Sequence, residues 1–492
     1  MVAAAHPLAV EAGYGVLKRG GTAVDAAIAV QMVLGLVEPE SSGIGGGAFL
    51  LHWSDKEKKL RSYDGRETAP AAARRDLFFD SNRKQLEFRD AAVSGLSVGV
   101  PGVLRMLELA HKRHGKLPWA ELFDPAIALA EQGFTASPRL RMLMERERFQ
   151  LSLKNPEYAA TLRAIAQGGA DAFYRGALTA DMVRAVRSHA RPGELTAQDF
   201  ADYRALEREP LCGTYRAWRI CSMGPPSSGG VAVLQILGIL ERTSFARAPP
   251  QSAAAVHYFA EAGRLAYADR ARYLGDPDFN AVPTRKLLSG KYLDERAKLI
   301  SERSMRLAPV RDTEAVGTSH LSIVDAAGDA VSMTTTIEAT FGSRIMVRGF
   351  LLNNQLTDFD FMPGSPNEVA PRKRPRSSMA PAMVFSGTRL DLVIGSPGGP
   401  NIINYVAKAL VGALDWKLDL QSAVALPNFG SRNGPTLIER DSSYEGLIRE
   451  LSNRGHEIET PPLTSGLHGI ERVPGGWRGA ADPRREGAVK GD

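Results

Sequence analysis

The segment 317–338 constrains the fold more than any other part of this sequence. It reads Gly-Thr-Ser-His-Leu-Ser-Ile-Val-Asp-Ala-Ala-Gly-Asp-Ala-Val-Ser-Met-Thr-Thr-Thr-Ile-Glu, two runs rich in hydroxyl and β-branched residues on either side of a glycine. This pattern predicts a β-hairpin with strands at 320–325 and 330–337. Taken alone, the hairpin could simply present a polar sheet face to its surroundings.

The turn decides which side chains of this hairpin face each other. A three-residue turn at 326–328, with Gly328 in the left-handed conformation, places Thr318 opposite Thr336. A two-residue turn would shift the register by one and put the two threonines on opposite faces. We expect the three-residue turn, because Gly328 is then its last residue.

The chain changes character at about residue 318. Before this point, apolar residues recur at helical spacing between glycines and prolines; after it, short strands dominate. A helix-rich part followed by a strand-rich part predicts an α+β fold with stacked helix and sheet layers in one interwoven unit. The clearest expected helices are 103–114, 124–132 and 251–274, and a second hairpin is expected at 382–385 and 390–394.

Composition and charge exclude several classes of protein. The chain has 492 residues, of which 44% are hydrophobic and 24% charged, as in ordinary globular proteins. Its net charge is +6, yet the densest basic stretch, 372–376, is short and interrupted by proline. No aromatic stacking residues are interleaved with it, so we expect no nucleic-acid partner. We expect a solvated basic surface at 372–376, with an anion-attracting rim around a site as the alternative.

The two cysteines, the apolar runs and the first residues of the chain give expectations about where in the cell the protein is found. Cys212 and Cys221 flank a segment that alternates like a tight hairpin, so a disulfide between them is conceivable. The most apolar run, 24–37, contains Asp25 and Gln31 and is too short to span a bilayer. No signal peptide is recognisable after Met1, which taken at face value predicts a cytoplasmic protein.

Motifs for cofactors and other catalytic classes are absent. The glycine-rich run 41–48 nominally fits a dinucleotide-binding loop, but 49–53 reads as a strand where that loop requires a helix. We therefore expect a tight structural turn. The sequence contains no P-loop, no Gly-x-Ser-x-Gly elbow, no His-Glu-x-x-His and no Cys-x-x-Cys. We expect no cofactor and no metal.

Several short motifs together resemble one family along nearly the whole chain. Each is weak alone, but their joint occurrence in this order is specific to the γ-glutamyltranspeptidase (glutathione hydrolase) family of the N-terminal-nucleophile hydrolases. The motifs lie at 6–9, 20–27, 38–47, 64–70, 225–230, 352–355, 374–379 and 395–399.

The resemblance implies a four-layer αββα sandwich and a chain that cuts itself. The cut would fall between Gly317 and Thr318, giving pieces 1–317 and 318–492 that stay associated. Gly317 has no Cβ, so its backbone can distort toward the Thr318 hydroxyl. The cut frees the Thr318 amine, whose ordinary pKa of about 7.7–8.0 suits a general base for the hydroxyl beside it. One residue then supplies both nucleophile and base.

The resemblance also implies roles for nine further residues. Thr336 would tune the Thr318 hydroxyl, and the amides of Gly398 and Gly399 would form an oxyanion hole. The substrate's α-carboxylate would bind a guanidinium and two hydroxyls, and its ammonium would bind carboxylates and an amide. These groups are Arg66, Ser377 and Ser378 for the carboxylate, and Gln355, Asp358 and Glu338 for the ammonium.

Three departures from the family pattern refine the expected activity. Glu338 stands where members often carry asparagine, which favours substrates with an ammonium group over glutaryl compounds. The segment 359–373 is too short for a lid, so we expect an open site and bulky leaving groups or acceptors. Pro400-Asn401 replaces a common Ser-Arg pair.

The implied activity is γ-glutamyl hydrolysis and transfer. Glutathione is the expected substrate, and water, an amino acid or a peptide amine is the acceptor. The alternatives are a cephalosporin (glutaryl) acylase and an unprocessed, non-catalytic binding homologue. The resemblance implies a periplasmic or secreted location. This differs from the cytoplasmic location that follows if Met1 is the true start, because no signal peptide is recognisable there.

Overall fold

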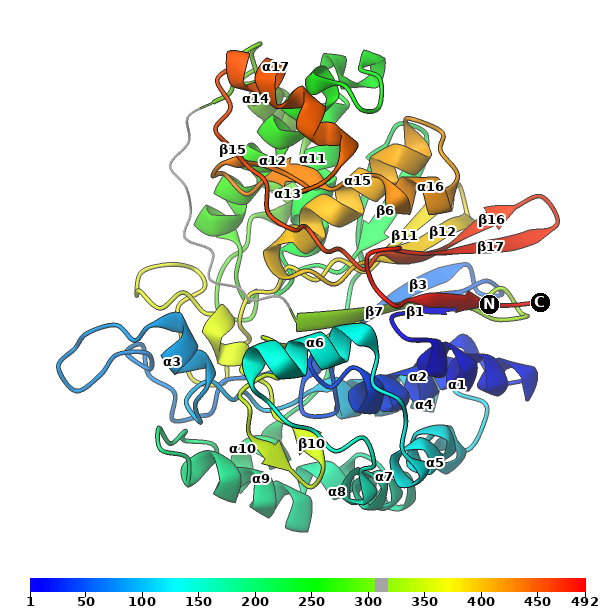
Figure 1. Ribbon diagram of the computed structural model, residues 1–492, viewed down its shortest axis with the longest axis vertical. Coiled ribbons are helices and arrows are strands. Elements are labelled where there is room, and N and C mark those ends of the chain that lie inside the picture. The colour runs from blue at the N-terminus through cyan, green and yellow to red at the C-terminus, as the bar shows by residue number, and fades with distance from the viewer. Residues whose placement is uncertain (306–316) are drawn as a thin grey trace.

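The computed structural model describes residues 1–305 and 317–492, which form two β-sheets packed face to face between two layers of helices (Figure 1). The order of layers is helices, a seven-stranded sheet, a six-stranded sheet and helices. This is the four-layer αββα sandwich that the motifs predicted. The two chain ends lie close together at one side of the sheets.

The seven-stranded sheet carries the predicted nucleophile. Its order is β18-β1-β7-β8-β2-β3-β4, and all neighbours are antiparallel. Both parts of the chain contribute to it, since β1 lies between β18 and β7 and the pair β7–β8 lies between β1 and β2, so the two halves of the chain are interwoven. Its strands are β1 (Val2–Ala4), β2 (Gly47–Ser54), β3 (Lys59–Gly65), β4 (Leu206–Arg208), β7 (Gly317–Val324), β8 (Ala330–Glu338) and β18 (Ala488–Lys490).

The six-stranded sheet, of order β17-β16-β12-β11-β6-β5, is also antiparallel and drawn from both halves. Apolar side chains such as Trp53, Phe385 and Val393 fill the space between the two sheets. Burying each side chain of this kind stabilises the fold by about 1.5–3 kcal/mol. Its strands are β5 (Leu211–Tyr215), β6 (Trp218–Ser222), β11 (Ala382–Ser386), β12 (Arg389–Gly395), β16 (His468–Val473) and β17 (Gly476–Ala481).

Helix α2 (Ala23–Val37) forms the centre of the layer that covers the seven-stranded sheet. It is buried along its whole length because it is apolar on all sides, and Thr22 with Asp25 forms a capping box at its start. Around it lie α1 (Pro7–Lys18), α4 (Val103–His114), α5 (Asp124–Gln132), α6 (Pro138–Glu147), α7 (Pro156–Gly168), α8 (Asp171–Tyr174), α9 (Ala177–Arg187), α10 (Ala197–Asp202) and the pair β9 (Met346–Val347) and β10 (Phe350–Leu351).

The layer on the six-stranded sheet is built on α11 (Gly229–Leu240), α12 (Ala253–Tyr273), α15 (Ile402–Leu414) and α16 (Leu420–Ala425). The Ser252 hydroxyl caps the start of α12. Outside these helices lie α13 (Thr284–Leu287), α14 (Gly290–Ala297), α17 (Ile448–Asn453) and the small sheet β13 (Phe429–Ser431), β14 (Thr436–Ile438) and β15 (Ile458–Glu459).

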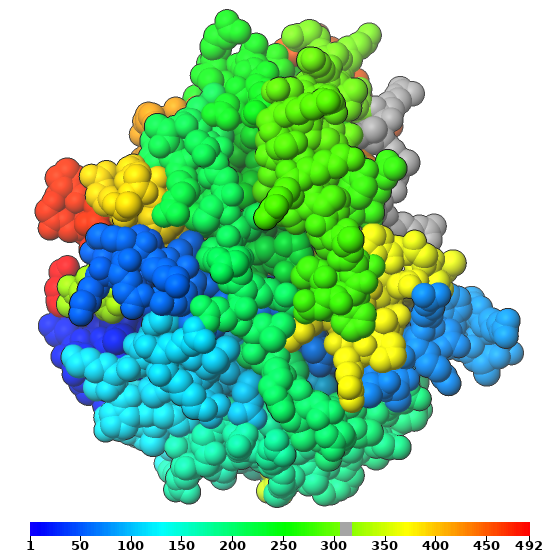
Figure 2. Space-filling view, turned by 180° about the vertical axis from the view of Figure 1, so that it is seen from behind, coloured from blue at the N-terminus to red at the C-terminus, as the bar shows by residue number. Residues whose placement is uncertain are grey.

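A projecting lobe supports the turn η3 (Gln355–Asp358). The lobe combines residues 71–92, which end with α3 (Phe88–Ala92), with the segment near 360–370, and the two lie side by side at one edge of the molecule (Figure 2). The rings of Phe78 and Phe361 stack with centroids 4.2 Å apart, and Leu356 packs into the same cluster. The lobe thereby anchors two of the predicted substrate-binding residues.

Most of the predicted elements are confirmed. The helices 103–114 and 124–132 are α4 and α5, and 251–274 contains α12. Both predicted hairpins form, as β7–β8 and β11–β12. Gly328 has φ +83° and Thr318 pairs with Thr336, so the three-residue turn is correct. The first 300 residues also contain six strands: β2 agrees with the strand expected at 49–53, and β5 and β6 agree with the hairpin-like segment between the cysteines, whereas β1, β3 and β4 were not predicted.

The expected solvated surface at 372–376 is wrong. Arg372 is exposed, but Lys373, Arg374 and Arg376 are buried. They donate to backbone carbonyls, and Arg374 and Arg376 also approach the carboxylates of Asp64 and Asp360 at 3.5 Å and 3.3 Å. Three of these partners, Asp64, Arg204 and Leu274, are distant in sequence, so the charge run itself gave no sign of them.

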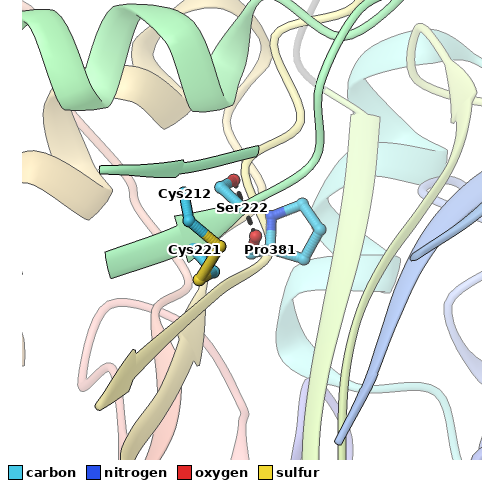
Figure 3. The surroundings of a disulfide bond; sticks show 4 residues. All are labelled: Cys212, Cys221, Ser222 and Pro381. Carbon is cyan, nitrogen blue, oxygen red and sulfur yellow. Dashed lines mark hydrogen bonds between the residues drawn. A yellow bond between two sulfur atoms is a disulfide. The ribbon is translucent and has the colours of Figure 1, made fainter. Parts of the chain in front are cut away.

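Cys212 and Cys221 form a disulfide between the paired strands β5 and β6 (Figure 3). Next to it, the Ser222 hydroxyl donates to the Pro381 carbonyl at 2.7 Å and ties β6 to the segment before β11. The conceivable pairing of the cysteines is therefore confirmed. Among the described residues, no helix has the length and apolarity needed to cross a membrane.

Candidate active site

Nine of the ten predicted site residues line one small pocket. The tenth, Gly398, directly precedes a lining residue. The cavity has a volume of about 20 Å³, room for roughly one water. Its walls are Arg66, Thr318, Thr336, Glu338, Gln355, Asp358, Ser377, Ser378, Met379, Gly399 and Ile402.

Thr318 and Thr336 form a hydroxyl pair on adjacent strands. Their Oγ1 atoms are 3.2 Å apart, and both donate to the Gly317 carbonyl oxygen, at 2.7 Å from Thr318 and 2.6 Å from Thr336. Thr336 Oγ1 in turn accepts from the Glu338 amide at 2.8 Å, which fixes its orientation. The hydroxyl of the predicted nucleophile thus lies directly against the peptide bond that is expected to break.

The backbone changes register at this peptide bond. Thr318 pairs with Thr336, whereas Gly317 pairs with Glu338, so one residue of β8 is passed over. A Cβ on Gly317 would lie 2.5 Å from the Glu338 carbonyl oxygen. Only glycine fits here without a shift of the neighbouring strand.

Gly398 and Gly399 follow β12 and precede α15. Both have positive φ values, +134° and +55°, which glycine adopts at no steric cost. Within the described part of the chain, neither amide N–H donates a hydrogen bond. A Cβ on Gly398 would lie 2.5 Å from a carbon of the Tyr405 ring. Two free amides near a helix start can stabilise a developing negative charge.

Arg66 is the buried cation of the pocket. Its guanidinium donates to the carbonyls of Pro375 and Arg376 at 3.0 Å and 2.8 Å and to the Asp358 carboxylate at 2.5 Å. These contacts place the cation and a carboxylate side by side. A zwitterionic head group needs both.

Two acceptor atoms on η3 lack partners among the described residues. Asp358 Oδ1 and Gln355 Oε1 are buried without a hydrogen bond, while Gln355 Nε2 donates to Asp358 Oδ2 at 2.6 Å. Burial raises the pKa of Asp358, and Arg66 opposes this effect. Free buried acceptors are costly, so they indicate a site for a donor such as an ammonium group.

Glu338 is the last residue of β8 and lines the pocket. It is buried with φ +80°, a conformation unusual for a residue with a side chain. The Asn354 side chain donates to its carboxylate and accepts from the Ala339 amide at 2.9 Å. Asn354 therefore fixes the Glu338 carboxylate, a role that sequence reasoning missed, although 352–355 was among the motifs.

Arg270 of α12 was also missed. It is buried, and its guanidinium donates to the hydroxyls of Ser378 at 2.9 Å and Ser228 at 2.8 Å. Ser228 Oγ donates in turn to the Ser377 carbonyl at 2.6 Å. Arg270 thus supports the two serines of the carboxylate end. The spacing of α12 predicted a helix but did not show which face meets the pocket.

Metal-ligand side chains come together elsewhere, at His257, Glu261 and His456, the one such group among the described residues. His257 Nδ1 lies 2.8 Å from His456 Nε2, and His456 Nδ1 lies 2.7 Å from the Thr436 hydroxyl. Both Glu261 oxygens accept hydrogen bonds. The atoms that would bind a metal are therefore used within the protein.

Comparisons with known proteins cover the whole chain. A family model described as Gamma-glutamyltranspeptidase matches residues 9–154 and 149–492. The glutathione hydrolase proenzyme of Bacillus subtilis (strain 168) is 36% identical over 536 residues, which cover 100% of this chain and 91% of that protein. The glutathione hydrolase proenzyme of Escherichia coli (strain K12) is 35% identical over 529 residues, 98% of this chain and 90% of that protein.

Solved structures agree with the fold. The crystal structure of a cephalosporin acylase from Bacillus halodurans superposes with a TM-score of 0.87 at 27% identity, covering 99% of this chain and 95% of that one. The four layers are therefore shared with enzymes of known structure over nearly the entire chain.

Proposed function

Since this chain belongs to the γ-glutamyltranspeptidase family, we propose that it cuts itself before Thr318 and then hydrolyses or transfers γ-glutamyl groups, with glutathione as its substrate. The observation that carries the proposal is the pocket itself. A hydroxyl pair, two free backbone amides and a cation–carboxylate pair surround one small space.

Self-cleavage uses the contact between the Thr318 hydroxyl and the Gly317 carbonyl. The hydroxyl oxygen attacks the Gly317 carbonyl carbon and loses its proton, and the C–N bond then breaks as the Thr318 nitrogen takes up a proton. Water hydrolyses the resulting ester. The products are a carboxylate on Gly317 and a free hydroxyl and amine on Thr318, in pieces 1–317 and 318–492.

Substrate cleavage uses the same hydroxyl with its new base. The Thr318 amine accepts the hydroxyl proton as the oxygen attacks the γ-carbonyl of the substrate. The amides of Gly398 and Gly399 stabilise the negative oxygen, and such donors each contribute about 10²–10³ in rate. The leaving amine departs with the proton, and water or an acceptor amine then releases the γ-glutamyl group from Thr318.

The head group is held at the far end of the pocket. Arg66, Ser377 and Ser378 bind its carboxylate, while Asp358, Gln355 and Glu338 surround its ammonium. A glutaryl substrate has no ammonium and would leave Asp358 Oδ1 and Gln355 Oε1 unpaired, at about 1–3 kcal/mol for each buried acceptor. This cost favours γ-glutamyl compounds as substrates. The second candidate function is a glutaryl acylase, and the fold similarity to a cephalosporin acylase supports it.

We also propose that the protein works in an oxidising compartment outside the cytoplasm. The disulfide Cys212–Cys221 supports this location, because such bonds are kept reduced in most cytosols. The alternative, a cytoplasmic protein, predicts free thiols at both positions.

Two measurements test the function. On a denaturing gel the purified protein should show bands near two-thirds and one-third of 53.1 kDa, and Thr318→Ala should show one band. The cut protein should release p-nitroaniline from γ-glutamyl-p-nitroanilide at least tenfold faster than from the glutaryl analogue. A chain that stays whole and leaves both compounds intact would contradict the proposal, and a preference for the glutaryl compound would favour the acylase.

A further inference from the structure

At Thr318, strand β7 has a strand neighbour on one side only. On that side β8 pairs with Thr318 through Thr336, but β1 pairs with β7 only at 321–323. After the cut, Thr318 would be a chain end with one strand beside it. Chain ends of this kind fray unless other contacts hold them.

Arg485 occupies the open side of Thr318. It lies on the connection from β17 to β18, which crosses from the six-stranded to the seven-stranded sheet. Its Nη1 donates to the Thr318 carbonyl at 3.3 Å, and its Nη2 donates to the Thr464 carbonyl at 3.2 Å. The side chain is buried, with 8% of the residue exposed. A guanidinium thus replaces the hydrogen bond that a further strand would supply.

A buried carboxyl group supports the same region. Ser319, the residue after the nucleophile, donates through its hydroxyl to Glu38 at 2.7 Å, and the Ser42 hydroxyl lies 3.1 Å from that of Ser319. Glu38 attracts Arg485 electrostatically and is itself buried at the end of α2. Arg485 and Glu38 therefore hold two consecutive residues of β7 from two different parts of the chain.

Arg485 also lies close to the loop that carries Gly398, because a Cβ on Gly466 would be 2.7 Å from Pro397 and 2.8 Å from Arg485. Tyr405, whose ring packs against Gly398, is one of the groups that interact electrostatically with Arg485. Burial lowers the pKa of Arg485 to about 10, so it stays a cation at neutral pH. Arg485, which binds the Thr318 carbonyl, thus lies close to the start of the oxyanion loop.

We propose that Arg485 is a positioning residue, which holds the Thr318 hydroxyl and amine in line with the amides of Gly398 and Gly399 by binding the Thr318 carbonyl. It acts through Thr318 and contacts no substrate. The proposal rests on the function proposed above, in which Thr318 is the nucleophile.

The test compares Arg485→Met and Arg485→Lys with the wild type, using cut enzyme and γ-glutamyl-p-nitroanilide. Arg485→Met should lower kcat by roughly 10- to 100-fold, the effect of a displacement of about 1 Å at a reacting group, and leave KM within about twofold. Arg485→Lys should recover part of the loss, because an ammonium can donate to one carbonyl. Arg478→Met, on the exposed side of β17, is the matched control and should retain the wild-type kcat.

Equal kcat values for Arg485→Met and the wild type would overturn the proposal, as would a rise in KM alone. If Arg485→Met does not accumulate as a folded chain, Arg485→Gln carries the test, since its shorter amide keeps a polar group in the buried space but does not reach Thr318. Wild-type kcat in that variant overturns the proposal equally. A wild-type chain without γ-glutamyl activity would instead contradict the proposed function, and with it this inference.

Discussion

At the nucleophile end of the pocket, Thr318 and Thr336 are fixed by the pairing of β7 with β8, and the groups that meet there are hydroxyls and backbone amides. At the head-group end, Arg66 and Asp358 come from a strand end and a short turn, and they meet as an ion pair. The first end depends on the register of a sheet. The second depends on charges brought together by loops.

This difference separates two kinds of effect. A change at the nucleophile end should alter the chemical step, because it affects the position of the reacting oxygen. A change at the head-group end should alter substrate binding, and through it the choice of substrate. Four predictions test this separation, beginning with the largest expected effect.

Thr336→Val should lower kcat by about 10²-fold with little change in KM, because valine keeps the shape but loses the hydroxyl that lies 3.2 Å from Thr318 Oγ1. Thr335→Val is the matched control. Thr335 Oγ1 is buried without a partner in the described chain, so its loss should leave kcat unchanged. Similar losses in both variants would show that strand packing, and not the hydroxyl, matters.

Asp358→Asn should raise the KM for γ-glutamyl-p-nitroanilide by roughly tenfold and leave kcat within a few-fold. Asparagine can still accept from Arg66, but it removes the charge that attracts the ammonium. Asp360→Asn, on the same loop but paired with Arg376, should leave KM unchanged. A fall in kcat at constant KM would show that Asp358 acts in the chemical step, and would contradict the separation between the two ends of the pocket.

Glu338→Gln should reduce the preference for γ-glutamyl over glutaryl p-nitroanilide by a few-fold. Glutamine keeps the size of the side chain and removes its charge, so only the substrate with an ammonium loses an attraction. The ratio of the two kcat/KM values measures this effect. An unchanged ratio would mean that the Glu338 charge takes no part in selection.

Glu40→Gln should change stability and hardly affect activity. Burial, together with nearby Glu38, raises the pKa of Glu40 from its ordinary 4.5 to about 8. The folded chain therefore holds this proton more tightly than the unfolded chain, so stability falls as pH rises from 4.5 to 8.

In thermal unfolding, Glu40→Gln should gain stability relative to the wild type at pH 8, and the gain should shrink toward pH 5. Glu457→Gln, directly before β15 on the other side of the molecule, serves as the control and should show a constant difference. A pH-independent difference for Glu40→Gln would contradict a buried, protonated Glu40 behind the nucleophile end.

The sequence carried the information for the hairpin because its turn and its alternation are local. Gly328 fixed the turn length, and the turn length fixed the pairing of Thr318 with Thr336. The pocket residues were predicted through the order of family motifs. Their convergence around one cavity agrees with those assignments, while the individual roles stay predictions.

What sequence reasoning missed depends on contacts between distant segments. Arg270 and Arg485 look like ordinary charged residues on a helix and in a loop, and the site residues that they contact, Ser378 and Thr318, lie over a hundred residues away. The stretch 372–376 was misjudged for the same reason, since the carboxylates near Arg374 and Arg376 belong to other elements. A charge run shows net charge but not the counter-ions that the fold supplies.

The seven-stranded sheet contains strands from both sides of residue 317, and this determines how the enzyme, once cut as proposed, can refold after denaturation. There β7 and β8 lie between β1 and β2, so the small piece has no complete sheet of its own. Before the cut, refolding is a first-order process within one chain. After it, recovery requires two separate molecules to meet, so its rate should fall on dilution while aggregation of exposed strands competes. If the chain is cut as proposed, it must therefore fold first as one molecule and be cut afterwards, and the cut enzyme persists only while its two pieces stay together.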